Sequence, residues 1–501
     1  MAPRARAPRW AACCAAAASP AAAYWCHSDV YLGPVAQAES KGLALDDTTF
    51  RHCPGKVPEI WPNALDLVSH LRIFKAWEPG WPESARAGTW RRIADFAAIN
   101  GARVLVGTQV TCTPEADEQD WQWTKELLAL LGPEQVMGVA VGNEMELLFS
   151  KGGVDHAVTE ECIEEVWGGG RFWRMFSRRV AELDAMGFGD VQVTSVFGGL
   201  ALNGEPFLES PREALVTSFL RNASSTYGQR FTFTFNFYPY FDPTLTLDPG
   251  TTDQCSRALA VATCFESNCS IPTMAASARQ KIQQLTGSSN DTFWVGETGW
   301  SAPTSSSLNT EMAKCKEWSS VETFRSFYER FLHWDMASVD GFRPPDHVFY
   351  FTARDSSNYG VPEAFGLVET CADVHCKLRG PTYIAPGEVA AIDLGWLRWA
   401  CAGLVGFMCL AVCGAAAYAK RDGRRMAREQ RELEARLCGS RGAPAPGGRA
   451  ARGPEASASD DGSQPAAALR ERKHAQASAS DDGPGLAVAR QAGGGGEESS
   501  V

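Results

Sequence analysis

Short apolar runs alternate with longer amphipathic stretches through most of this chain. The runs hold about five apolar or β-branched residues, as buried parallel strands do, and the stretches between them carry an apolar residue every three or four positions, as helices packed on a sheet do. Eight runs can be placed, at Val30–Leu32, His70–Phe74, Arg103–Gly107, Met137–Val141, Val191–Val196, Phe233–Phe237, Phe293–Gly296 and His347–Phe351. Eight repeated βα units predict an α/β fold, a (β/α)8 TIM barrel, over residues 24–385.

The sequence changes character after the predicted barrel. A linker, residues 386–398, leads to 21 residues without a charge, Trp399 to Ala419, and then to the basic residues Lys420, Arg421, Arg424 and Arg425. That length crosses a bilayer as a helix, and a flanking basic cluster marks the cytoplasmic side. We therefore expect one C-terminal transmembrane helix at 399–419 and a cytoplasmic tail at 420–501. A buried core helix rich in Ala and Gly is the alternative.

Both ends of the chain have a biased composition. Three arginines in the first nine residues precede an Ala-rich stretch that ends at Ala23, which predicts a signal peptide over residues 1–23. The stretch is poor in Leu and contains Pro20, so an imperfect start of the gene model is the alternative. The tail repeats Ala-Ser-Ala-Ser-Asp-Asp-Gly at 456–462 and 477–483. Such low-complexity sequence buries little apolar surface, so residues 440–501 are expected to be disordered.

Cysteine usage predicts an oxidising compartment. Ten of the 16 cysteines fall between residues 24 and 385, an even number that allows up to five disulfides. Their pairing stays open, although close spacing makes local bridges possible between Cys264 and Cys269 and between Cys371 and Cys376. No Cys-x-x-Cys pair occurs and the eight histidines lack ligand spacing, so neither a metal nor a cofactor is expected.

Charge and sequons narrow the set of partners. The formal net charge is −12, and an acidic body repels phosphate backbones, which argues against nucleic acid and is compatible with a neutral polymer such as a glucan. Asn222, Asn268 and Asn290 each begin an Asn-x-Ser/Thr triplet. These asparagines would be glycosylated if the barrel is extracellular or lumenal, as we expect.

Two glutamates stand at the ends of predicted strands. Glu144 closes the run that begins at Met137, and Glu297 lies in the run from Thr292 to Trp300. An apolar strand tolerates a carboxylate poorly, so a Glu at its C-terminal end, beside Gly or Asn, is better explained by chemistry than by packing. Either motif alone can be a strand that runs into a solvated turn. Together they supply the two carboxylates that cleavage of a glycosidic bond requires.

The sixth predicted strand ends in an aromatic cluster that contains an asparagine, Phe-Asn-Phe-Tyr-Pro-Tyr-Phe at 235–241. Core packing followed by a turn accounts for Phe235 and Phe237. Tyr238 and Tyr240 have polar tips that a core would have to satisfy, and rings at a barrel mouth make flat platforms for sugar faces. We therefore expect the two tyrosines to contribute to a binding surface.

Several of these motifs resemble glycoside hydrolase family 17, the β-1,3-glucanases, within the clan of barrels whose acid/base lies on strand four and whose nucleophile lies on strand seven. The resemblance covers about Tyr31 to Val368. It is carried by Val-Gly-Asn-Glu ending at Glu144, by Asn-Phe-Tyr-Pro-Tyr starting at Asn236, and by Gly-Glu-Thr-Gly-Trp ending at Trp300. Weaker matches are Tyr-Leu-Gly-Pro at 31–34, for the first strand, and Leu-Arg-Ile-Phe at 71–74, for the second.

The resemblance implies a role for each matching residue. Glu144 would be the general acid/base and Glu297 the nucleophile of a double displacement. Asn143 would hold the 2-hydroxyl of the reacting sugar, and Tyr238 would hydrogen-bond Glu297. The substrate-binding residues implied are Asn143, Asn236, Tyr238, Tyr240 and Trp300.

The chain departs from the family pattern at the predicted rim of the site. The family usually has Pro directly after the Gly-Trp of the nucleophile motif, where this chain has Ser301. Near strand eight, Ser356 replaces a Glu, and Glu363 stands one position closer to the aromatic-Gly-Leu that follows. These changes put linkage and chain-length preference in question more than the reaction itself.

The sequence thus predicts a single-pass membrane protein with an endo-acting, retaining glycosidase barrel that cleaves β-1,3-glucan. Its partners would be a β-glucan polysaccharide and the membrane. Two alternatives stay open: a β-1,3-glucan transglycosylase, which passes the same covalent intermediate to another sugar, and a catalytically idle glucan-binding receptor. Retention of both glutamates with Asn143 and Tyr238 counts against the receptor, because binding alone does not require a charged pair at reaction distance.

Overall fold

A computed structural model describes Cys26 and residues 31–151, 158–204, 206–207, 214–241, 253–302, 315–356, 364–372, 376–379 and 428. The chain divides into two compact units, Met1–Ile392 and Asp393–Val501. The predicted signal peptide (1–23), linker (386–398) and membrane span (399–419) lie outside the described residues, as does the tail (420–501) apart from Arg428. Among the helices that are described, none combines the length and apolarity that crossing a membrane requires.

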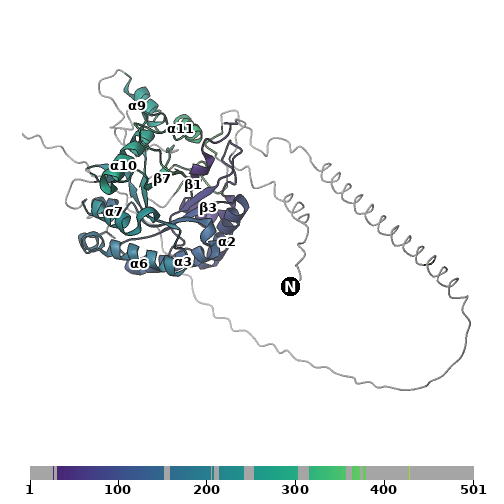
Figure 1. The fold of residues 1–501 in the computed structure, drawn as a ribbon. Helices are drawn as coiled ribbons and strands as arrows, with labels where there is room; N and C mark the ends of the chain where they lie inside the picture. The colour runs from purple at the N-terminus through teal and green to yellow at the C-terminus, as the bar shows by residue number, and fades with distance from the viewer. Residues whose placement is uncertain are drawn as a thin grey trace, which may run out of the picture. The chain divides into compact units, whose positions relative to one another are not determined.

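Eight parallel strands close into a barrel in which each strand pairs with its neighbours in sequence and β1 pairs with β8 (Figure 1). They are β1 (Lys41–Ala44), β2 (His70–Ile73), β3 (Arg103–Thr108), β4 (Val136–Asn143), β5 (Gln192–Gly198), β6 (Thr232–Asn236), β7 (Thr292–Thr298) and β8 (His347–Phe351). This topology confirms the predicted (β/α)8 barrel.

The helices surround the strands (Figure 1). Described helices are α1 (Asp47–His52), α2 (Glu83–Asn100), α3 (Pro114–Leu131), α4 (Leu148–Lys151), α5 (Glu160–Ile163), α6 (Arg171–Ala185), α7 (Ala214–Tyr227), α9 (Gln254–Ala262), α10 (Ser270–Thr286) and α11 (Val321–His333). A π-helical turn, η6 (Glu164–Gly168), and a 3-10 turn, η5 (Met145–Leu147), lie between β4 and α6. The longer helices turn one apolar side to the barrel; in α2 this side includes Trp90, Ile93 and Ala97.

The strands form the centre of the core. Nearly every residue of β3, β4, β5 and β7 is buried, because the outer face of each strand is covered by helices and the inner face fills the barrel. The predicted strand positions are confirmed for β2 to β8, within a few residues at the ends. Continuous apolar runs were therefore sufficient to locate these seven strands.

The prediction for the first strand is wrong. Residues 31–32 are not in a strand, and Tyr31 is exposed; β1 begins at Lys41 and continues through Gly42, two residues that seldom favour strands. Lys41 is buried because its Nζ donates to three carbonyl oxygens, those of Ala36, Leu332 and Trp334, at 2.6 to 2.9 Å. Burial lowers the pKa of Lys41 to about 7. Contacts distant in sequence thus stabilise a strand that its own composition does not indicate.

All ten cysteines of the predicted barrel form disulfides: Cys26–Cys376, Cys53–Cys371, Cys112–Cys162, Cys255–Cys315 and Cys264–Cys269. The local bridge at Cys264–Cys269 is present. A Cys371–Cys376 bridge is not, because each of these residues pairs with a cysteine near the N-terminus. Three bridges join loops that follow neighbouring strands: β3 to β4, β6 to β7, and β8 to β1. They therefore hold together the loops at the C-terminal end of the barrel.

Candidate active site

The two predicted glutamates meet at the C-terminal end of the barrel. Glu144 directly follows β4, and Glu297 is the penultimate residue of β7. The regular pairing shifts beside each position, between Ala140 and Asn143 on β4 and between Val295 and Thr298 on β7. Such irregularities change the direction of side chains at a strand end. They direct polar groups toward the mouth of the barrel, where active sites of this fold lie.

Three hydrogen-bond donors surround the Glu297 carboxylate, which is 6% exposed. Arg72 Nη1 and Asn236 Nδ2 donate to Oε1 at 2.9 and 2.8 Å, and the Tyr238 hydroxyl donates to Oε2 at 2.6 Å. Donors of this kind, one of them a cation, stabilise negative charge on a carboxylate. The group can therefore serve as an anionic nucleophile.

One amide connects the two carboxylates. Asn236 Nδ2 donates to Glu297 Oε1 at 2.8 Å and to Glu144 Oε1 at 3.0 Å, while its Oδ1 accepts from Arg72 Nη1 at 3.2 Å. The arginine thus fixes which end of the amide faces the glutamates. Because both Oε1 atoms touch one nitrogen, they lie no farther apart than the sum of the two distances. That bound is below the roughly 6.5–9.5 Å of inverting glycosidases and near the roughly 5–5.5 Å of retaining ones.

Glu144 has an unusual backbone conformation. Its φ and ψ of 48° and 47° are left-handed, a region that costs a non-glycine residue roughly 1–3 kcal/mol. Its backbone N–H donates to the Val196 carbonyl of β5 at 2.7 Å, which holds the turn in place. The side chain is half-buried, and the preceding Asn143 is exposed. The turn thus places both polar side chains at the mouth of the barrel.

Arg72 was not predicted as a site residue, although it joins three of the predicted ones. It lies on β2, is 2% exposed, and donates to Asn143 Oδ1 at 2.6 Å in addition to Asn236 and Glu297. Gly296 leaves room for it, since a Cβ there would lie 2.7 Å from both Arg72 Nη1 and Asn236 Oδ1. The available signal was a charged residue inside the short strand His70–Ile73.

The predicted aromatic residues lie at different depths. Tyr238 is half-buried and packs edge-on against Phe365, while Phe241, which was not predicted, is 52% exposed. Tyr240 and Trp300 are buried, and their polar atoms contact the Ser319 hydroxyl and the Trp318 carbonyl. A buried ring offers no face to a sugar. In this structure Tyr240 and Trp300 therefore support the wall of the site, and Tyr238 and Phe241 lie at its surface.

The rim after β8, where the chain departs from the family pattern, contains a buried ion pair. Lys377 Nζ contacts both oxygens of Asp355, at 2.6 and 2.9 Å, and the carbonyl of Ala364 at 2.8 Å. Burial raises the pKa of Asp355 to about 6, against the opposing effect of Lys377. Ser356 beside it is buried and Glu363 lies outside the described residues. The ion pair joins the loop after β8 to the segment that follows it.

In two groups of side chains, the possible ligand atoms lie as close together as those around a metal ion. The groups are Cys255 with Cys315 and Glu317, and Cys264 with Cys269 and Glu266. The cysteines of each group are joined in a disulfide, so their sulfurs are not thiolates. The predicted glycosylation sites Asn222, Asn268 and Asn290 are all exposed. Their modification remains a prediction.

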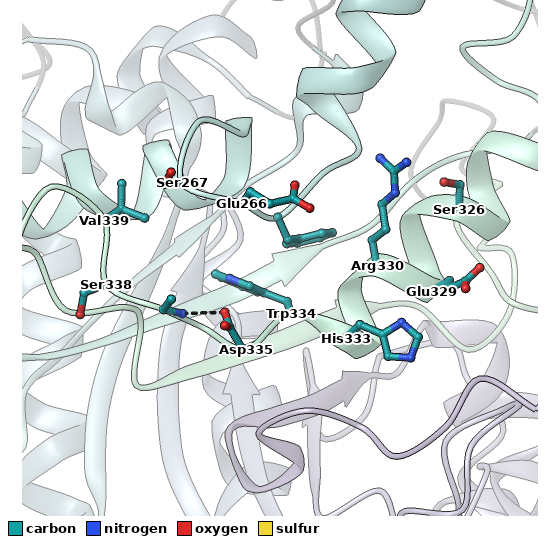
Figure 2. Close-up of a pocket in the computed structure, with 12 residues that line it drawn as sticks. Glu266, Ser267, Ser326, Glu329, Arg330, His333, Trp334, Asp335, Ser338 and Val339 are labelled. Atoms are coloured by element: carbon teal, nitrogen blue, oxygen red, sulfur yellow. Dashed lines mark hydrogen bonds between the residues drawn. The ribbon is translucent and has the colours of Figure 1, made fainter.

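A separate groove of about 680 Å³ lies between the end of α11, the segment that follows it, and the turn between α9 and α10 (Figure 2). Figure 2 shows Glu329, Arg330 and His333 on α11 and Asp335 just beyond it, with Glu266 across the groove. Its lining includes none of the residues that contact Glu144 or Glu297. The groove is therefore distinct from the candidate active site.

No protein-family model matches this chain, and no curated protein sequence matches it. Among solved structures, the chain is similar to a plant β-glucan endohydrolase, with 14% identity, 60% of this chain and 87% of the other covered, and a TM-score of 0.41. A β-glucosidase from Thermotoga maritima shows 13% identity, coverage of 70% and 97%, and a TM-score of 0.36. The GH53 catalytic domain of Ignisphaera aggregans shows 15% identity, coverage of 62% and 82%, and a TM-score of 0.33. These similarities are too low to carry a functional argument, so the assignment of the barrel rests on its strand pairing.

Proposed function

We propose that this chain is a retaining glycosidase that cleaves β-1,3-glucan through a covalent glycosyl-enzyme. The observation that carries the proposal is the Asn236 amide, which contacts an oxygen of each glutamate and so holds two carboxylates within reach of one sugar. A structural role alone would not place two carboxylates side by side at the mouth of a barrel, because their like charges repel. The linkage and the polymer follow from the motif resemblance alone.

In the first step Glu297 attacks the anomeric carbon while Glu144 gives its proton to the departing glycosidic oxygen. The bond to the leaving sugar breaks and a bond from Glu297 to the anomeric carbon forms. Arg72, Asn236 and Tyr238 align the attacking carboxylate before the reaction, which lowers the entropic part of the barrier.

In the second step Glu144, now ionised, takes a proton from water as the water attacks the anomeric carbon. The bond to Glu297 breaks, the sugar leaves with its original configuration, and Glu144 regains its proton. We propose that Asn143 holds the 2-hydroxyl of the reacting sugar; its exposure and the hydrogen bond from Arg72 Nη2 to its Oδ1 at 2.6 Å support this role.

We further propose that the barrel is extracellular or lumenal, anchored by the span at 399–419. Five disulfides in the described residues are in keeping with an oxidising compartment. Protease protection of sealed membrane vesicles tests this orientation. Cleavage of the barrel and of the tail should occur from opposite sides of the membrane, and cleavage of both from one side would contradict it.

Product analysis with the full-length chain in membranes tests the reaction. We expect new reducing ends from β-1,3-glucan, fewer from a mixed-linkage glucan, and none from either with Glu297→Gln. Glu329→Gln, an exposed glutamate on α11, is the matched control and should retain wild-type turnover. Products longer than the substrate would indicate a transglycosylase instead. Glucan binding without any product would indicate a receptor and overturn the enzymatic proposal.

A further inference from the structure

A third glutamate lies directly behind the candidate acid/base. Glu146 is in η5, two residues after Glu144, and is 5% exposed. Neither the motifs nor the resemblance assigns it a role. A carboxyl group this deeply buried normally has a cation or several donors around it.

The donors to the Glu146 carboxyl among the described residues are two backbone N–H groups, its own and that of Gly198. The backbone N–H of Gly198, the last residue of β5, donates to Oε1 at 2.5 Å. The other oxygen, Oε2, is buried and has no hydrogen-bond partner in this part of the chain. A buried carboxyl oxygen without a hydrogen-bond donor disfavours the ionised carboxylate and favours the protonated carboxyl group. Burial, followed by repulsion from Glu144, raises the pKa of Glu146 to about 8.

The carboxyl groups of Glu146 and Glu144 both lie beside Gly198. A Cβ at this position would lie 2.7 Å from Glu146 Oε1 and 3.4 Å from Glu144 Oε1. A residue with a Cβ at this position would therefore clash with Glu146 Oε1. The same Glu144 oxygen accepts from Asn236, so Glu144 stands between the buried carboxyl and the nucleophile's hydrogen-bond network.

The surroundings of Glu146 provide no compensating charge in the described residues. From β5 the backbone N–H of Gly198 donates to Glu146, and from η6 the Trp167 indole donates to the carbonyl of the neighbouring Met145 at 3.2 Å. The charged group that acts on Glu146 is Glu144. The two carboxyls therefore titrate as a coupled pair, in which ionisation of one opposes ionisation of the other.

We infer that Glu146 is a positioning residue that extends to higher pH the range in which Glu144 can hold the proton it donates. The inference rests on the proposed function. While the pair retains one proton, the arrangement with that proton on Glu144 stays available. After Glu144 has given its proton to the leaving group, a protonated Glu146 adds no second negative charge beside it. The chemical steps and their atoms are otherwise unchanged.

The pH profile of kcat/KM for Glu146→Gln in the full-length chain tests this inference. The alkaline limb should move toward acid by about one pH unit or more, because the single remaining carboxyl loses its proton earlier. The acidic limb should stay in place, because the nucleophile and its hydrogen-bond donors are unchanged. A variant with lower kcat but an unmoved alkaline limb would show a purely structural role and overturn the inference. Glu329→Gln serves again as the control.

Infrared difference titration separates this inference from the proposed function. A protonated carboxyl band that disappears near pH 8 in the wild type and is missing in Glu146→Gln would support the coupled pair even if the chain cleaved no glucan. Loss of that band in the ordinary glutamate range, near pH 4.5, would overturn it. A wild type without glycosidase activity but with the band would overturn the proposed function alone.

Discussion

The two ends of the barrel differ in the polar residues that they hold and in the charge of those residues. Four strands begin with a basic residue, namely Lys41, His70, Arg103 and His347, whereas β4, β6 and β7 end in or beside Asn143, Glu144, Asn236 and Glu297. At the N-terminal end, burial lowers the pKa values of Lys41, His70 and His347, so these groups tend toward the neutral form. At the C-terminal end, Arg72 and Glu297 form a buried ion pair at 2.9 Å.

Because of this difference, we expect the N-terminal end to contribute mainly to stability and the C-terminal end to contribute mainly to chemistry. At the N-terminal end, backbone carbonyls accept from Lys41, and the His70 ring forms a hydrogen bond with the Ser69 hydroxyl, so these contacts close the barrel. The C-terminal end instead concentrates charges beside the exposed Asn143 and the half-buried Glu144. Changes at the C-terminal end should therefore affect turnover, and changes at the N-terminal end should affect the free energy of unfolding.

After the complete loss expected from Glu297→Gln, the largest effect is expected from Glu144→Ala. Loss of general acid catalysis should slow substrates with poor leaving groups by about 10²–10⁴-fold, and activated aryl glycosides much less in the first step. Azide should restore turnover and give the β-glycosyl azide, because a small anion attacks the glycosyl-enzyme without a base. The same treatment of Glu297→Ala should give the α-azide, and an α-azide from Glu144→Ala would exchange the two roles.

A smaller loss is expected from Arg72→Lys. The guanidinium reaches Glu297 with Nη1 and Asn143 with Nη2, a span that a single ammonium cannot reproduce. Misalignment of the nucleophile should reduce kcat by about 10²-fold with little change in thermal stability. Steady-state kinetics with Arg91→Lys, an exposed position on α2, as control would measure it. Wild-type kcat in Arg72→Lys would mean that the charge alone suffices.

At the opposite end, Lys41→Met should destabilise the fold without changing the chemistry. Three carbonyls lose their donor, at roughly 1 kcal/mol each, so the free energy of unfolding should fall by about 3 kcal/mol. Denaturant unfolding provides this value. Turnover per folded molecule should stay within about twofold of wild type, and a selective loss of turnover would break the proposed division between the two ends.

The smallest effect is expected in the pH dependence of stability. Burial, followed by the charge of Arg103, lowers the pKa of His70 from 6.5 to about 4. Between these values the unfolded chain binds a proton that the folded chain does not, so the stability that His70 contributes is lost as pH falls from 6.5 toward 4. In His70→Gln, the drop in the free energy of unfolding between pH 6.5 and pH 4 should be smaller by about 1 kcal/mol, after allowance for the partial exposure of His70. His52→Gln, at an exposed position, should leave the slope unchanged.

Continuous apolar runs located β2 to β8 because a strand buried on both faces must be apolar along its length. The same reasoning singled out Glu144 and Glu297, since a carboxylate at the end of such a run is costly unless it has a use. Tyr238 and Asn236 followed from motifs in the same segments. These features depend on neighbours in sequence, which is why they could be predicted.

Only the tertiary structure decided the rest. Strand β1 is stable because Lys41 reaches carbonyls at Leu332 and Trp334, nearly three hundred positions away in sequence. The cysteine pairing, the depth at which Trp300 is buried and the contacts of Arg72 depend in the same way on which loops and strands become neighbours when the barrel closes. Glu146 stands two residues from Glu144, yet its burial follows from β5. Composition and periodicity report on local preference, whereas the energies of these groups depend on what surrounds them in space.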